Sequence, residues 1–210
     1  MKKFLMSIMA VLFAANSFAQ FTSGGFSLSE SSVYYGARIG LNLSTLTGDV
    51  ADGLGMKAGL NVGPVIGLRL SDATPVFLES GLFFTMHGAK DGDNSVALNY
   101  LKLPVLIKYG IQVSDQVAVL PFLGPTIGIG IAGKTKVAGL NSWNSFSNDF
   151  AEYSRPDVGI RFGCGAEWNH LYLEVGYEFG ITNIADWKKN PTDDASVHNG
   201  ALAINFGVNF

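Results

Sequence analysis

From Tyr34 to Phe210 the chain alternates apolar side chains with polar or small ones, with a period of two residues. This is the period of a β-strand, in which successive side chains point to opposite faces. Sorting residues by parity gives eight strand-like segments, and one face of all eight carries no charged residue. Ser80 is the only clearly polar residue on that face. The alternation therefore predicts an all-β fold.

The opposite face of these segments is polar and crowded with glycine. Fifteen of the 26 glycines lie on it. Its ten charged residues are five bases and five acids: Arg38, Arg69, Lys102, Lys108 and Arg161, and Glu79, Asp157, Glu167, Glu174 and Glu178. Glycines on a water-facing surface would weaken the strands without any gain in packing. In the narrow interior of an eight-stranded barrel they make room for long charged side chains. The polar face should therefore line the lumen and the apolar face should meet lipid, which predicts an eight-stranded antiparallel transmembrane up-and-down β-barrel.

The connections between segments alternate in length. Long ones are expected at 46–55, 88–98, 133–154 and 183–199, and short ones at 71–74, 112–115 and Asn169-His170. Long loops outside and short turns inside are typical of outer-membrane barrels with both termini in the periplasm.

A two-residue turn at Asn169-His170 fixes the register of the strands around it. It places Arg161 opposite Glu178 in the lumen, and Trp168 opposite Leu171 on the outer face. We therefore expect Arg161 to lose its partner when Glu178 is replaced by leucine. An aromatic girdle is predicted at the periplasmic rim, formed by Tyr35, Tyr109, Trp168 and Phe210.

The N-terminus has the features of a secretory signal peptide. Lys2 and Lys3 precede an apolar run over 4–15, and Ser17-Phe18-Ala19 forms a small-residue cleavage site. We expect cleavage after Ala19, which divides the chain into a signal peptide at 1–19, a periplasmic segment at 20–33 and an outer-membrane barrel domain at 34–210.

Composition excludes several other classes of protein. The low charged fraction of 15% and the high hydrophobic fraction of 48% exclude disorder, and a lone cysteine excludes a disulfide scaffold. A net charge of −3 argues against a nucleic-acid partner. The uncharged stretch 116–133 contains two prolines and four glycines and alternates in hydropathy, so a spanning helix is not expected there.

Three stretches resemble the PorT-type outer-membrane β-barrel family: YGARIGLNLSTL at 35–46, YLKLPVLIKY at 100–109 and FLGP at 122–125. The strand spacing from Tyr34 to Phe210 is also similar to that of small OmpX-like and OmpW-like barrels. The resemblance implies an eight-stranded barrel, and the last strand resembles the C-terminal signal that the outer-membrane assembly machinery recognises. A subset of the family assists a protein secretion system. Prolines at 64, 104, 121 and 125 lie inside strands, and we expect bulges to accommodate them.

Motifs that could carry chemistry lack the context that they need. The glycines of 128–133 match a dinucleotide-binding spacing, but no amphipathic helix follows them. Asp91-Gly92-Asp93-Asn94 lacks the spaced ligands of a calcium loop and is interpreted as a hairpin tip. His87, His170 and His198 lie on different elements near strand ends or in a loop. No catalytic, cofactor-binding or metal-binding residue is therefore expected, and no cofactor.

We expect a non-enzymatic outer-membrane barrel with long extracellular loops and a structural, adhesion or interaction role. Its expected partners are outer-membrane lipids, the assembly machinery during biogenesis and an unidentified protein at the extracellular loops. Trp143 and Phe146 either form a recognition surface there or fold onto the barrel rim. Three alternatives stay open: a component assisting a protein secretion system, a narrow porin-like channel or small-solute transporter, and, weakest, a lipid-modifying enzyme. The equal numbers of acidic and basic residues in the lumen favour structural ion pairs over a charge-selective pore.

Overall fold

The computed structural model describes residues 32–48, 55–71, 73–139, 142–146, 152–186 and 196–210. The predicted signal peptide at 1–19 and most of the predicted periplasmic segment at 20–33 lie outside these residues. Within them the chain forms strands only, and no helix is both long and apolar enough to cross a membrane. The strands are β1 Val33–Thr47, β2 Gly55–Arg69, β3 Val76–Gly81, β4 Phe83–Asp91, β5 Asn94–Tyr109, β6 Ile111–Ser114, β7 Val117–Lys136, β8 Glu152–Tyr153, β9 Pro156–Trp168, β10 Leu171–Gly180, β11 Ala185–Asp186 and β12 His198–Asn209.

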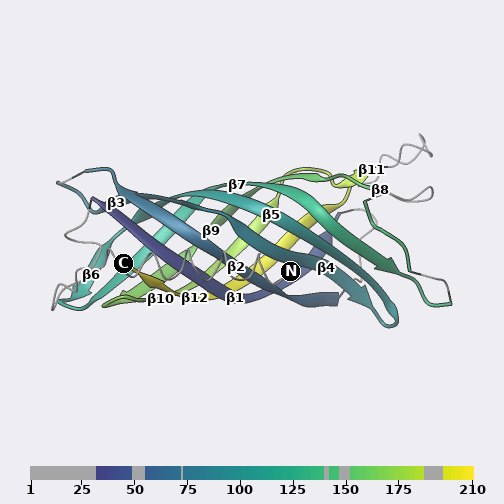
Figure 1. The fold of residues 1–210 in the computed structure, drawn as a ribbon, viewed down its shortest axis with the longest axis horizontal. Helices are drawn as coiled ribbons and strands as arrows, with labels where there is room; N and C mark the ends of the chain where they lie inside the picture. Colours follow the sequence, from purple (N-terminus) through teal and green to yellow (C-terminus); the bar gives the residue numbers. More distant parts are fainter. Residues whose placement is uncertain (1–31, 49–54, 72, 140–141, 147–151, 187–195) are drawn as a thin grey trace, which may run out of the picture.

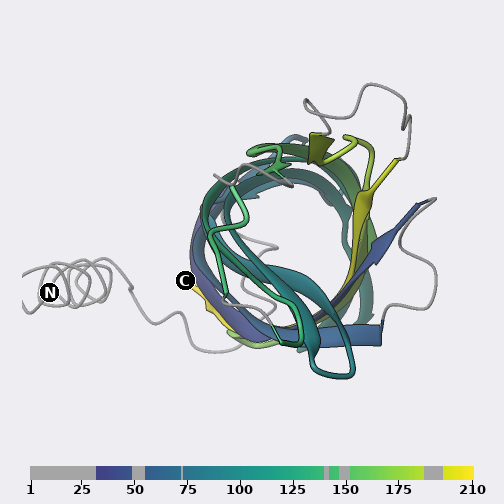
Figure 2. The same cartoon turned by 90° about the vertical axis from the view of Figure 1, so that its right-hand side faces the viewer.

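These strands build a closed antiparallel ring of eight, as predicted. β3 and β4 keep one register with β5 on both sides of Leu82, so they act as a single interrupted strand. β5 and β6 likewise keep one register with β7 on both sides of Gly110. β1 pairs with both β2 and β12, which closes the ring. Figure 1 shows the tilted strands from the side, and Figure 2 looks down the ring from the end with the long connections.

The outer surface of the ring is apolar, as the parity of the sequence predicts. Side chains such as Ile39, Ile107 and Phe206 are about half exposed although they are large and apolar. Ser80, the polar member of this face, donates its hydroxyl to the Pro104 carbonyl at 2.8 Å. Because that hydroxyl has a partner within the wall, it can face lipid at little cost.

Short turns gather at one end of the ring and long connections at the other; we call these the short-turn end and the long-loop end. Asn169-His170 is a two-residue turn, with Asn169 in the left-handed region at φ 54°. The predicted pairs Arg161 with Glu178 and Trp168 with Leu171 lie directly opposite each other. The register predicted for this hairpin is confirmed.

Two predicted connections were wrong in extent. Residues 88–98 belong mostly to a β4–β5 hairpin whose tip is Gly92-Asp93, because Asp91 still pairs with Asn94. The strand predicted to end near 112 continues through β6 to Ser114, so the turn follows at 115–116. In both places the polar tips of paired strands resemble loop sequence.

The prolines do not cause the expected bulges. Register is continuous across Pro64, Pro104, Pro121 and Pro125. At Pro64, which cannot donate, the neighbouring strand is interrupted at Leu82, whose amide still donates to the Pro64 carbonyl. The shifts in register lie elsewhere, between residues 56 and 61 of β2, at Asn99/Tyr100 of β5 and at Gln112/Ser114 of β6.

Candidate functional site

The lumen of the ring holds a chain of alternating charges near the short-turn end. Arg38 Nη2 lies 3.1 Å from Glu79 Oε2, and Glu79 Oε1 lies 2.8 Å from Lys108 Nζ. Lys108 continues to Glu174 at 3.8 Å, and Glu174 Oε1 lies 2.6 Å from Arg161 Nη2. All five side chains are buried. Each acid thus lies between two bases, so the attraction between unlike charges offsets the cost of removing them from water.

Neutral side chains complete this charge chain. Tyr34 donates its hydroxyl to Glu79 at 2.7 Å, Lys108 donates to the Tyr172 hydroxyl at 2.7 Å, and Asn205 donates to Glu174 at 2.8 Å. The Arg38 guanidinium also stacks over the Tyr172 ring, with Cζ 4.1 Å from the ring centre. These contacts come from β1, β3, β5, β10 and β12, so they tie strands together across the lumen.

A second, smaller charge cluster centres on Lys102 of β5. Its Nζ lies 2.6 Å from Asp157 Oδ2 of β9 and also pairs with Glu178 Oε1 of β10. All three groups are buried.

The ion pair expected between Arg161 and Glu178 was wrong, although the two residues are opposite each other. Arg161 reaches along the lumen to Glu174, which is opposite Gly165, and Glu178 turns to Lys102. A long side chain next to glycines can choose partners along the barrel axis as well as across the ladder. Replacement of Glu178 would therefore leave Arg161 paired.

The two remaining predicted lumen charges, Glu167 and Arg69, have other hydrogen-bond partners as well. Glu167 is fully buried and accepts a hydrogen bond from Asn209 at 2.7 Å. Arg69 is half-buried at the short-turn end, where its Nε donates to the Ser71 carbonyl at 3.0 Å. The predicted girdle residues Tyr35, Tyr109, Trp168 and Phe210 are all exposed on the outer face at that end.

Apolar layers lie on both sides of the charges, and the sequence reasoning missed them. The layer at the short-turn end consists of Tyr34, Phe77, Ala118, Leu120 and Tyr172. The layer at the long-loop end consists of Leu46, Ala89, Leu98, Tyr100, Phe146, Ile184 and Val197. Large apolar residues at lumen parity, such as Phe77 and Leu120, were the available signal.

The layer at the long-loop end includes a segment folded back into the barrel mouth. Phe146 is 2% exposed and packs edge-on against Tyr100, with ring centres 6.0 Å apart. A side chain at Gly130 or Gly133 would collide with its ring, so these lumen glycines make room for Phe146. β8 pairs with β11 above it, and burial raises the pKa of the Tyr153 phenol in β8. We call residues 142–146, β8 and β11 the cap.

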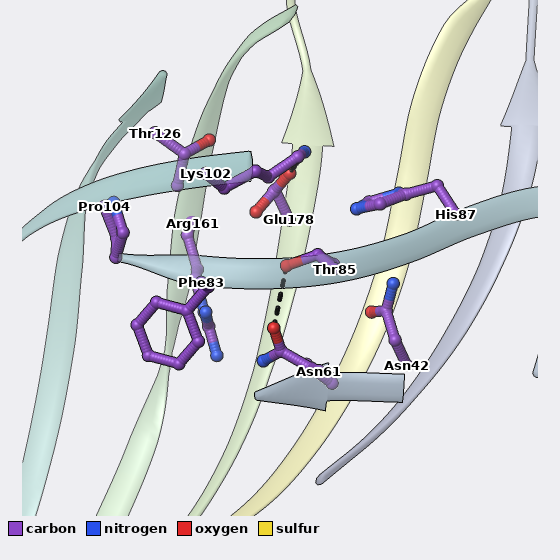
Figure 3. A pocket seen from close by; sticks show the side chains of 11 residues that line it. Asn42, Asn61, Phe83, Thr85, His87, Lys102, Pro104, Thr126, Arg161 and Glu178 are labelled. Carbon is purple, nitrogen blue, oxygen red and sulfur yellow. Dashed lines mark hydrogen bonds and ion pairs between the residues drawn. The ribbon is translucent and has the colours of Figure 1, made fainter. Parts of the chain in front are cut away.

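Between the layers lies a small polar cavity of about 10 Å³, which is room for about one water molecule. Figure 3 shows its lining, which includes Asn61, Thr85, His87, Lys102 and Glu178. His87 is buried, and neither ring nitrogen has a hydrogen-bond partner among the described residues. The prediction that His87 lies near a strand end was wrong, because β4 continues past it and turns its ring into the lumen.

The motifs that resembled chemical sites have structural positions. On β7, Gly128 and Gly130 face the barrel lumen, while Ile127, Ile129 and Ile131 face outward. Gly92 occupies the hairpin tip with φ 53°. His170 and His198 contact the backbone carbonyls of Asn209 and Thr182. In the described part of the chain, no three His, Cys, Asp or Glu side chains are grouped as metal ligands would be.

A buried, ion-paired lumen within a ring of outward apolar side chains matches a known class of membrane protein. A family model described as an outer membrane protein beta-barrel domain matches residues 18–186, which is more than half of the chain. No curated protein sequence matches.

Solved structures with a similar fold include surface protein A of Neisseria, at 16% identity and a TM-score of 0.51 over 86% of this chain and 98% of that one. Others are Ail, the attachment invasion locus protein of Yersinia pestis, at 15% identity over 86% and 100% with a TM-score of 0.44, and the outer membrane protein OprG from Pseudomonas aeruginosa, at 13% identity over 89% and 98% with a TM-score of 0.47. The chain belongs to the outer membrane protein beta-barrel domain family, and its compartment is the bacterial outer membrane.

Proposed function

We propose that this protein is a sealed, non-enzymatic barrel that anchors its long loops at the outer surface of the outer membrane for a structural or interaction role. The observation that carries the proposal is the filling of the lumen. Two apolar layers enclose the buried ion pairs, and the small cavity between them has room for about one water. A conducting pore needs a continuous water path and usually a ring of one charge sign.

Conductance across planar lipid bilayers tests the proposal. We expect the purified mature protein to give no stepwise current, at either polarity, at concentrations where a known porin gives clear steps. Reproducible steps would contradict a sealed barrel and favour the narrow channel or small-solute transporter. If the barrel does not conduct, the long-loop end, which includes the cap, is the surface available to a protein partner.

Two observations support the non-enzymatic part. The lipid-facing Ser80 hydroxyl is bound to the Pro104 carbonyl rather than to a base. Glu174 and Glu178, two carboxylates on one strand face, are each held by buried cations. Incubation of the protein with radiolabelled outer-membrane phospholipids should release no product, and acyl transfer or hydrolysis would contradict this part.

A secretion-associated role is the second candidate, supported by the resemblance of 35–46 and 100–109 to the PorT-type family. The β6–β7 hairpin offers a contact surface at the periplasmic end, because all four β6 residues are exposed. A photo-crosslinking amino acid at Gln112 should give one discrete large adduct in cells if this role is correct. The same amino acid at the lipid-facing Ile39 is the control.

The remaining parts of the proposal concern biogenesis. We propose that the chain is exported and cleaved after Ala19, that 20–33 stays in the periplasm, and that the assembly machinery recognises the final strand through Phe210. N-terminal sequencing of the mature protein should begin at Gln20. Deletion of Phe210 should lower the amount of folded barrel in the outer membrane, whereas Asn209→Ser should lower it less.

A further inference from the structure

Three lysines point outward from the barrel wall at the long-loop end. Lys90 lies at the end of β4, and Lys134 and Lys136 lie at the end of β7, with β5 between them. The register puts Lys90, Ser95 and Lys136 in one row across the three strands. The row below it contains Gly88, Ala97 and Lys134. In Figure 1 these strand ends project together at the right. We call Lys90, Lys134 and Lys136 the lysine patch.

A β-bulge in β7 turns two of these lysines outward. Tyr100 pairs with Gly130 while Asn99 pairs with Ala132, so Ile131 is an extra residue in the ladder. An extra residue reverses the facing of every residue after it. Thr135 is consequently buried, and Lys134 and Lys136 are exposed. Without the bulge, both lysines would point into the apolar layer beneath the cap.

No carboxylate of the described residues is ion-paired with the lysine patch. Within the described residues, Lys90, Lys134 and Lys136 form no ion pair, whereas the lumen lysines 102 and 108 each have two. The outward side chains between them are only those of Ser95 and Ala97. The nearest carboxylates in sequence, Asp91 and Asp93, lie at the hairpin tip. The patch therefore attracts an anion and leaves space for it.

The size of the patch suits phosphate groups. Neighbouring strands lie about 4.8 Å apart, and residues two apart on one strand are separated by about 7 Å. The three lysine Cα atoms therefore lie within roughly 12 Å of one another, and their flexible stems let the ammonium groups converge.

The position of the lysine patch along the barrel axis indicates which anions are close to it in the membrane. Toward the middle of the wall, the row next to the patch holds Met86, Asn99 and Ala132. Beyond that row the outward residues are apolar, and Leu101 and Ile131 are 36% and 49% exposed. The lysines therefore lie where the acyl chains end and the lipid headgroups begin. Lysines at this boundary extend toward the headgroups.

We propose that the lysine patch binds the phosphate groups of an anionic lipid headgroup in the outer leaflet. The inference specifies the lipid partner of the barrel, and it rests on the proposed function only for placing the long-loop end outside. Binding would hold the β4–β5 hairpin and the end of β7 at the membrane surface.

The test measures binding of diphosphorylated lipid A to the folded mature protein in neutral detergent micelles, by native mass spectrometry. We expect K90Q/K134Q/K136Q to weaken binding about tenfold or more, and added salt to weaken binding to the original protein. The matching K90R/K134R/K136R variant should bind as the original does. Lys57→Gln is a second control, since Lys57 donates to the Val96 carbonyl instead of facing the lipid. Heat-modifiable migration on gels shows that each variant is folded.

Each remaining outcome decides a separate point. Equal binding by the triple glutamine variant overturns the site, and so does equal binding of dephosphorylated lipid A. Displacement of lipid A by millimolar inorganic phosphate overturns the choice of a lipid as the source of the phosphate. Stepwise conductance would contradict the sealed barrel while leaving this binding result intact, so the two proposals fail separately.

Discussion

At the scale of single residues, the lumen acids differ in how many partners they hold. Glu174 is ion-paired with Arg161 and Lys108 and accepts a hydrogen bond from Asn205. Among the described residues, Glu178 is ion-paired only with Lys102, and Lys102 forms a second ion pair with Asp157. Removal of one member of a buried ion pair is costly because the other charge is left without compensation. The cost should therefore follow the number of cations that lose their partner.

We predict that Glu174→Gln lowers the free energy of unfolding by about 3 to 5 kcal/mol, and Glu178→Gln by clearly less. The two residues share a strand and a face, so each is the matched control for the other. Urea unfolding in detergent, followed by tryptophan fluorescence, measures both. Equal losses would show that the partners differ from those in the structure.

A second residue-scale prediction concerns the glycines beneath Phe122. Gly163 and Gly176 are opposite each other, and a Cβ at Gly176 would lie 2.9 Å from Phe122 Cζ. Gly176→Ala should cost about 1 to 3 kcal/mol through overpacking. In a Phe122→Leu background the same change should cost less, because the colliding ring atom is gone. Additive effects in this double-mutant cycle would contradict the contact.

The residue scale also shows what the sequence could and could not predict. Parity assigned Ile39 to lipid and Glu174 to the lumen, because the strand period is two and one face carries no charged residue. The short turn fixed the register of Arg161. It could not predict the partner of Arg161, because an arginine beside glycines reaches several positions along the axis. The contact of Phe146 with the barrel rim was left as one of two alternatives for a different reason, because a long connection has no hydropathy period from which facing could be predicted.

At the scale of elements, the bulge in β7 separates two patterns. Below Ile131 the strand alternates lipid-facing isoleucines with lumen glycines, and above it the outward positions are Ala132, Lys134 and Lys136. Strict parity reading fails after the bulge, since one inserted residue exchanges the faces. The cap packs on the inner side of the same segment, where Thr135 bridges to Trp143 and bonds to Ser145.

The cap gives an element-scale prediction. Phe146→Ala removes a buried ring, a change that costs about 3 to 5 kcal/mol in packed cores, so it should loosen the cap locally. Tyr153 of β8 is partly buried against the same apolar layer and is followed by Ser154. Chymotrypsin should then cleave after Tyr153 at least about tenfold faster, while heat-modifiable migration persists. Phe179→Ala, the same truncation on the outer face of β10, should leave the cleavage rate unchanged.

At the scale of the whole molecule, the barrel reverses the usual order of a folded domain. Its apolar surface is outside, and its lumen runs from an apolar layer through paired ions to a second apolar layer. Each layer brings together side chains from several strands, so we expect closure not to depend on one side chain. The backbone hydrogen bonds are completed around the ring, which a lipid surrounding requires.

This reversal is testable at the only cysteine of the chain. Cys164 lies on the outer face of β9, exposed between lipid-facing Phe162 and Ala166. A nitroxide attached there in lipid vesicles should relax readily with dissolved oxygen and weakly with a water-soluble nickel complex, because oxygen concentrates among acyl chains and the complex is excluded. A nitroxide at Gln112→Cys in a Cys164→Ala background, on the exposed β6, should show the opposite preference. If the label on Cys164 preferred the nickel complex, the apolar face would not meet lipid.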